Sequence, residues 1–183
     1  MVPNTVFLTK GVGRDRDKLT SFEMALRNAG IARLNLVRVS SIFPPHCKLV
    51  PKARGLEMLS PGEITYVVLS ENATNEPHRL LAASIGIAIP TDRSQSGYLS
   101  EYHSFGETEQ KAGDYAEDLA ASMLATILGV EFDPYASWDS KRELWRISGK
   151  IVKTRNITQS AIGHKGGYWT TVIAGAVLIA RPD

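Results

Sequence analysis

The apolar residues of the chain recur with two different periods, which predict a mixture of strands and helices. Alternating or continuous apolar stretches predict strands over residues 5–9, 34–41, 64–69, 80–89, 97–104, 147–152 and 168–179. Apolar residues at helical spacing predict helices over 19–29 and 112–127, and a short helical piece near 56–59. Gly30 and Gly129 follow the two longer helical patterns, where a left-handed residue would end each helix. This mixed order favours an α+β fold with helices on the outer faces of the sheets.

Two groups of glycines predict connections between strands. Gly11 and Gly13 follow the first strand, and because the third glycine of a dinucleotide-binding loop is absent, they indicate a simple turn. The glycines over 163–167, between the last two predicted strands, indicate a hairpin loop. No linker, repeat or low-complexity tract divides the 183 residues, so we expect a single domain over 1–183.

Composition narrows the classes of function. The 21 Lys and Arg against 19 Asp and Glu are scattered, which does not indicate a nucleic-acid partner. The histidines are isolated and Cys47 is the single cysteine, so neither a metal site nor an internal disulfide is predicted. No apolar stretch reaches the ~20 residues that span a bilayer, and the N-terminus lacks a signal pattern. We therefore expect a soluble, cytoplasmic protein without membrane association.

The adjacent residues Ser40 and Ser41 are the strongest candidates for chemistry. They end an apolar stretch that follows Asn35, and the pair Pro44–Pro45 prevents a strand from continuing. The simplest interpretation is a strand that ends in a Ser-Ser-Pro-Pro turn.

The segment 35–45, with its Ser-Ser-Ile-Phe-Pro-Pro sequence, resembles the self-processing site of pyruvoyl-dependent arginine decarboxylases. The stretches 3–6, 21–31, 83–90 and 97–102 resemble other strands and the first helix of that family, so the resemblance covers nearly the entire chain. It implies a four-layer αββα sandwich, assembled as a homo-oligomer, either a trimer or a dimer of trimers. It also implies cleavage into residues 1–40 and 41–183.

Self-cleavage at this bond would produce the cofactor that the resemblance implies. The Ser41 hydroxyl would attack the Ser40 carbonyl to give an ester, and β-elimination would free a chain that ends at Ser40. The dehydroalanine left at position 41 would lose ammonia and become a covalent pyruvoyl group. Decarboxylation of an amino acid needs such an electron sink. The chain has no convincing lysine motif for pyridoxal phosphate, so we expect neither that cofactor nor a metal.

Two further residues match catalytic positions of the family. Glu101 matches the catalytic acid, and its apolar neighbours are expected to raise its pKa; the alternative is an edge-strand carboxylate that faces water. Asn35 matches a position that contacts the substrate near its carboxylate. Its amide could also donate a hydrogen bond to the oxyanion that forms at the Ser40 carbonyl.

Glu23 matches an acidic position that pairs with the substrate guanidinium. Aspartate is the expected residue there, so the extra methylene leaves the depth of the pocket and the acceptance of other amines open. The remaining substrate-binding positions implied by the resemblance are Leu26, Ala32, Leu34, Ser40 and Ile42. For Leu26, Ala32 and Leu34, core packing is the alternative.

The resulting prediction is decarboxylation of L-arginine to agmatine and CO2 by a self-cleaved enzyme. One alternative is a pyruvoyl decarboxylase that acts on another amino acid, such as histidine, ornithine or aspartate. Another is a non-catalytic trimeric binding protein whose Ser40–Ser41 bond stays intact. Serine hydrolysis is disfavoured because neither a Gly-x-Ser-x-Gly motif nor an evident His–Asp pair accompanies Ser41.

Overall fold

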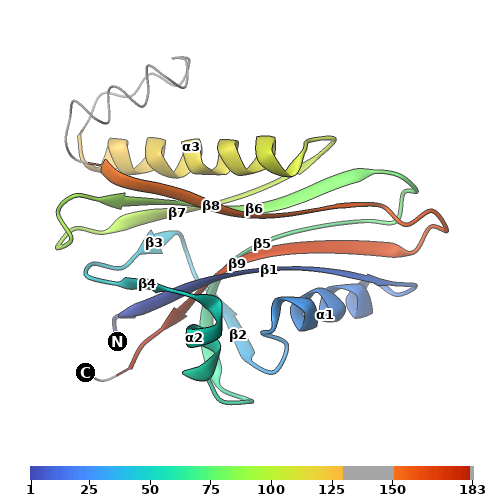
Figure 1. Ribbon diagram of the computed structural model, residues 1–183, viewed down its shortest axis with the longest axis horizontal. Coiled ribbons are helices and arrows are strands. Elements are labelled where there is room, and N and C mark those ends of the chain that lie inside the picture. The colour runs from blue at the N-terminus through green and yellow to red at the C-terminus, as the bar shows by residue number, and fades with distance from the viewer. Residues whose placement is uncertain (130–150, 182–183) are drawn as a thin grey trace.

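Two β-sheets stack face to face in the computed structural model, which describes residues 1–129 and 151–181 (Figure 1). The lower sheet has the strand order β2-β5-β9-β1-β4, and the upper sheet has the order β3-β7-β6-β8. Helices α1 and α2 cover the outer face of the lower sheet, and α3 covers the outer face of the upper sheet (Figure 1). The predicted α+β class and its αββα layers are confirmed.

The helices and strands follow the sequence pattern closely. Their bounds are β1 (Thr5–Asp15), α1 (Lys18–Ala29), β2 (Asn35–Arg38), β3 (Ile42–Phe43), β4 (Lys48–Val50), α2 (Lys52–Glu57), β5 (Ile64–Thr74), β6 (Leu80–Pro90), β7 (Gly97–Phe105), α3 (Glu109–Ile127), β8 (Ile151–Ile162) and β9 (Trp169–Ile179). Gly30 and Gly129 adopt the left-handed conformation predicted for them, with φ of 80° and 64°. Of the strand predicted over 147–152, residues 147–150 lie outside the described residues.

Two predicted elements are displaced or shortened. The short helix expected near 56–59 lies over Lys52–Glu57. The strand expected over 34–41 is limited to Asn35–Arg38, because its ladder with β5 ends at the pairing of Arg38 with Val67. The two serines therefore lie beyond the end of the strand.

The alternation of side chains along β9 explains why this strand is apolar throughout. Ile173, Val177 and Ile179 face the core beneath α1. The intervening residues Ala174, Ala176 and Leu178 face the core between the two sheets. A strand that is buried on both faces reads as a continuous apolar run, and β9 lies in the middle of the lower sheet.

The turn predicted at Gly11 and Gly13 is wrong, because β1 continues through both residues as far as Asp15. The two glycines lie where α1 approaches the strand most closely. A Cβ atom on Gly11 would overlap the carbonyl oxygen of Ala25, and one on Gly13 would overlap that of Ser21. The glycines are therefore explained by close packing of a helix on a sheet rather than by a turn.

The hairpin predicted between the last two strands is also wrong. β8 pairs with β6 in the upper sheet, whereas β9 pairs with β1 and β5 in the lower sheet. The connection over 163–168 therefore crosses from one sheet to the other. It lies against the β5–β6 connection, where the Gly163 N–H donates to the Arg79 carbonyl at 2.7 Å.

The close packing of α1 makes a testable prediction. We expect Gly11→Ala to lower the free energy of unfolding by about 1–3 kcal/mol, the usual range for an overpacked core, because the two atoms nearest to the new methyl group are backbone atoms. Gly175→Ala is the matched control in β9, since its methyl group would meet flexible side-chain atoms of Leu69 and Val67 at 3.3 and 3.4 Å. Urea unfolding of both variants tests the difference. Equal losses would contradict this explanation of Gly11.

Candidate active site

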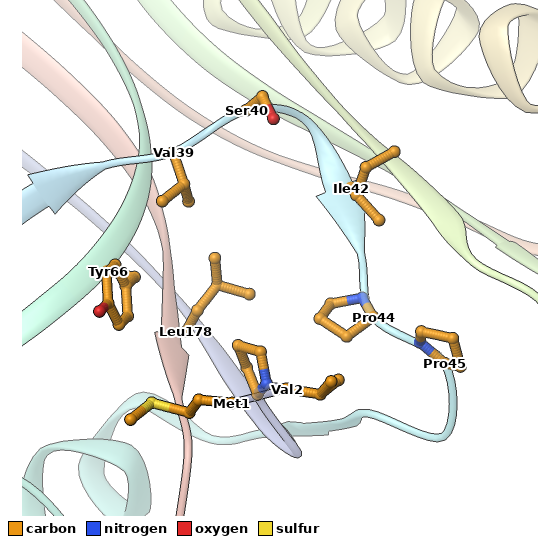
Figure 2. A pocket seen from close by; sticks show the side chains of 10 residues that line it. Met1, Val2, Val39, Ser40, Ile42, Pro44, Pro45, Tyr66 and Leu178 are labelled. Carbon is orange, nitrogen blue, oxygen red and sulfur yellow. The ribbon is translucent and has the colours of Figure 1, made fainter.

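Ser40 and Ser41 lie in the crossover that carries the chain from the lower sheet to the upper sheet (Figure 2). On the lower side, the Val39 N–H donates to the Val67 carbonyl at 3.0 Å. On the upper side, the Leu99 N–H donates to the Ser41 carbonyl at 2.7 Å. The peptide bond between the two serines is therefore held from its two sides by different sheets.

The carbonyl oxygen of Ser40 already has a hydrogen-bond donor. The Ile42 N–H donates to it at 3.0 Å, which closes a three-residue turn centred on Ser41. A donor at this oxygen withdraws electrons from the carbonyl carbon and stabilises the negative charge that develops when a nucleophile attacks that carbon. The turn thus prepares the one carbonyl that self-cleavage would use.

Asn35 does not supply that donor within one chain, so this expectation from the sequence is wrong. Its Nδ2 donates to the Gly62 carbonyl at 2.7 Å, and its N–H donates to the Glu63 carbonyl at 2.9 Å. Asn35 begins β2, five residues before Ser40, and an extended chain of that length spans roughly 16 Å. The backbone of Ile42 makes the contact instead.

An apolar pocket of about 360 Å³ opens beside Ser40. In Figure 2 the side chains of Val39, Ile42 and Leu178 surround this space, with Pro44 and Pro45 along one side. The remaining lining residues are Met1, Val2, Pro3 and Tyr66. The volume suits a small organic molecule, and the lining can exclude water from the neighbourhood of the serines.

Glu101 lies on β7 close to Ser41. Leu99, which binds the Ser41 carbonyl, is buried between the sheets, and Glu101 faces the same side about 7 Å further along the strand. β3 pairs with β7 at Gly97 and Tyr98, so the side chain of Glu101 lies beyond this short ladder and is exposed in the described chain. Burial of the carboxyl group raises the pKa of Glu101, whereas nearby Arg38 and His103 oppose the rise. The predicted direction of the pKa shift is confirmed.

Arg38 is a site residue that the sequence interpretation missed. It ends β2, two residues before Ser40, and forms an ion pair with Glu71 of β5. Because its charge also lowers the pKa of Glu101, Arg38 acts on two carboxylates at this edge of the molecule. The sequence could have indicated Arg38, because it is a single arginine among apolar residues just before the serines.

Two buried polar side chains hold β7 in place next to Glu101. Ser70 Oγ donates to the Tyr102 carbonyl at 2.6 Å, and Asn72 Nδ2 donates to the Ser104 carbonyl at 2.9 Å. Both donors lie on β5 in the lower sheet, so they tie the two sheets together. The alternation of Ser70 and Asn72 along β5 could have indicated these contacts, but the predicted strand ended at residue 69.

The predicted guanidinium-binding residue lies in a separate group. Glu23 is on α1, where its Oε1 accepts from Arg27 Nε at 3.0 Å. Leu26 and Leu34 are buried in the core beneath α1, and Ala32 packs against that core. This group lies on the outer side of the lower sheet, whereas Glu101 lies on the upper sheet (Figure 1). Within one chain, one group of predicted site residues lies together: Ser40, Ser41, Ile42 and Glu101. The others do not join this group: Glu23, Leu26, Ala32, Leu34 and Asn35.

Within residues 1–129 and 151–181, no three His, Cys, Asp or Glu side chains are grouped so that they could hold a metal ion. No helix in this described part of the chain is both long enough and apolar enough to cross a membrane.

Residues 5–182 match the family described as pyruvoyl-dependent arginine decarboxylase. The chain belongs to this family. It is 59% identical over 178 residues to a probable pyruvoyl-dependent arginine decarboxylase of Chloroherpeton thalassium, covering 97% of this chain and 98% of the relative. It is 57% identical to the pyruvoyl-dependent arginine decarboxylase of Nitrosopumilus maritimus, over 98% of both chains. It is 54% identical to pyruvoyl-dependent arginine decarboxylase 2 of Methanosarcina mazei, again over 98% of both chains. The resemblance inferred from the sequence is confirmed.

The position of Arg38 predicts how the pKa of Glu101 responds to mutation. A positive charge favours the ionised carboxylate, so Arg38→Gln should raise the pKa of Glu101 further above its ordinary value. Titration of the Glu101 carboxyl carbon by NMR measures this shift directly. Arg27→Gln, which removes an arginine from α1, is the control and should leave the Glu101 titration unchanged. An unchanged titration in Arg38→Gln would show that the arginine does not act on this carboxylate.

Proposed function

We propose that this member of the pyruvoyl-dependent arginine decarboxylase family cuts its own chain between Ser40 and Ser41 and then converts L-arginine to agmatine and CO2. The observation that carries the proposal is the Ser40–Ser41 crossover, in which the Ile42 N–H donates to the carbonyl that must be attacked. The names of relatives that are 54–59% identical over nearly the whole chain support the same activity.

Self-cleavage follows from the placement of the two serines. The Ser41 Oγ attacks the carbonyl carbon of Ser40, the C–N bond breaks, and an ester replaces the amide. β-Elimination then leaves a carboxylate on Ser40 and a dehydroalanine at position 41, and water replaces its nitrogen as ammonia departs. The Ile42 N–H stabilises the oxygen of Ser40 while it carries negative charge. The product at position 41 is a pyruvoyl group.

The residues around position 41 suit decarboxylation. The pyruvoyl group supplies a ketone that accepts the electrons released when the substrate carboxylate leaves as CO2. Glu101, whose pKa is raised by burial, is placed to deliver a proton to the carbon that has lost the carboxylate. The apolar pocket beside Ser40 offers space for a small molecule next to position 41.

Recognition of the arginine side chain requires a second copy of the chain in this proposal. Glu23 and Asn35 lie away from Ser41 and Glu101 within one chain, so one substrate molecule can touch both groups when they come from neighbouring subunits. A homotrimer provides such neighbours. The exposed apolar side chains of Val37 on the edge strand β2, Ile64 on the neighbouring β5 and Ile42 on the edge strand β3 offer surfaces for subunit contact. In this arrangement Glu23 pairs with the guanidinium and Asn35 binds near the substrate carboxylate.

The first test of the proposal is the mass of the purified protein. We expect two fragments, residues 1–40 and 41–183, and we expect the larger one to lack an N-terminal amine. Ser41→Ala should remain a single chain because it has no hydroxyl to attack the preceding carbonyl. Ser40→Ala is the control, since it keeps both the attacking hydroxyl and the attacked carbonyl and should still be cut.

Two results would contradict self-cleavage of this kind. A wild-type protein that stays at full length would favour a non-catalytic binding protein. A larger fragment from which Ser-Ile-Phe can be sequenced would indicate hydrolysis without formation of a pyruvoyl group.

The charge of Glu23 provides a test of the substrate. Glu23→Gln should weaken arginine binding by roughly 1.5–3 kcal/mol, the range for a hydrogen bond to a charged group. The change should appear mainly in KM, because the guanidinium is held alike before and during the reaction. Arg27→Gln is the matched control: it removes the same ion pair on α1 but keeps the carboxylate, so it should not raise KM.

The substrate assignment fails under either of two outcomes. One is a KM for arginine that does not change in Glu23→Gln. The other is a wild-type enzyme that decarboxylates an amino acid with an uncharged side chain faster than arginine. In both cases self-cleavage would stand, and only the identity of the substrate would change.

A further inference from the structure

The short segment that follows Ser41 is tied to the loop over residues 91–96, just before β7. The His46 N–H donates to the Arg93 carbonyl at 2.8 Å, and the Arg93 side chain donates back to the Cys47 carbonyl through Nη2. The Arg93 guanidinium also lies over the ring of Phe43, 6.0 Å from its centroid. A single arginine therefore contacts this segment through its backbone, its charge and its flat face.

The turn that Arg93 holds has an unfavourable backbone conformation. His46 has a φ of 56°, in the left-handed region that residues other than glycine seldom adopt. Such conformations persist when surrounding contacts impose them. The two hydrogen bonds of Arg93 bracket His46, one at its N–H and one at the carbonyl of the next residue. Together with the bond from the Cys47 N–H to the Pro44 carbonyl at 3.3 Å, they can impose this turn.

Arg93 is itself presented by an organised loop. The side chain of Asp92 accepts hydrogen bonds from the Ser94 N–H at 2.9 Å and from the Ser94 hydroxyl at 2.6 Å. The Gln95 N–H donates to the Asp92 carbonyl at 3.1 Å. These bonds close a compact turn around Arg93, which helps to fix the position of its backbone.

Few backbone hydrogen bonds hold this segment to the upper sheet, and its buried side chains Phe43 and Cys47 pack in the core between the sheets. β3 contributes two paired residues, Ile42 and Phe43, next to the single hydrogen bond between Ser41 and Leu99. After cleavage, position 41 becomes a chain end, and free ends fray unless they are tied down. An anchor a few residues downstream limits this motion before and after the cut.

We propose that Arg93 is a positioning residue for self-cleavage. By holding Phe43–Cys47 against the upper sheet, it keeps the Ser41 hydroxyl near the Ser40 carbonyl, whose other side is fixed to the lower sheet. Arg93 touches none of the reacting atoms and acts through the chain that it anchors. This inference rests on the self-cleavage proposed above.

The test is the rate of self-cleavage in the full-length protein, followed by the intact mass of newly synthesised chains during a pulse–chase. Arg93→Ala should slow cleavage at least tenfold. Arg93→Lys should recover part of the rate, because its ammonium group can still donate to the Cys47 carbonyl. Arg79→Ala is the matched control and should be cut at the wild-type rate: it removes an arginine that lies over Phe105 at 4.9 Å and pairs with Glu76, on the other side of the molecule from the serines.

A second measurement separates positioning from loss of the fold. In the uncleavable Ser41→Ala background, adding Arg93→Ala should leave the Tm within a few degrees and the near-UV circular dichroism unchanged. Cleavage of Arg93→Ala at the wild-type rate would overturn the inference. So would slow cleavage that Arg93→Lys does not improve and that accompanies a collapse of the Tm. If the wild-type protein itself is never cut, the proposed function fails, and this inference fails with it.

Discussion

The passage of the chain from one sheet to the other at Ser40 and Ser41 is the constraint on which the site depends. Each side of this peptide bond is held by a different sheet, through Val39 on Val67 and Ser41 on Leu99. The packed core between the sheets fixes the distance that the bond must span. In the proposed cleavage, the same two anchors would keep the new ends close to their starting positions. A rigid sandwich thereby converts an ordinary Ser-Ser sequence into a bond with a defined geometry.

Polar contacts between the sheets determine the surroundings of Glu101, the proposed proton donor. Ser70 and Asn72 are buried, and each donates to a carbonyl of β7 that lies just after Glu101 in the chain. Buried donors and acceptors are costly when unpaired, so these two bonds favour one position of β7 against β5. Glu101 thus lies on a strand with a fixed position, and partial burial of its carboxyl group raises its pKa. The two bonds between the sheets therefore help to fix the position of Glu101.

Helices and strands were predicted correctly where the pattern of apolar residues within one segment determines them. The errors arose where the structure depends on residues that are distant in the sequence. β6 and α3 were found because burial on both faces and helical spacing are visible within each segment. The role of Gly11 was predicted wrongly, because the sequence does not show that α1 packs too closely on this position to leave room for a side chain. The last two strands were assigned to one hairpin because the sequence does not show which sheet each joins. The serines were found through the family resemblance, whereas Arg93 has a role only through its contacts in the fold.

The separation of the site into two groups has a consequence for how the substrate is chosen. Ser41 and Glu101 lie at the edge between the sheets, whereas Glu23 lies on the outer side of the lower sheet, on α1. A change at Glu23 therefore leaves the anchors of the scissile bond untouched. In the proposed function, cleavage and proton delivery depend on contacts between the two sheets, and selection of the side chain depends on how neighbouring copies meet. A chain that works in this proposed way could change the amine that it accepts without losing the ability to make its own cofactor.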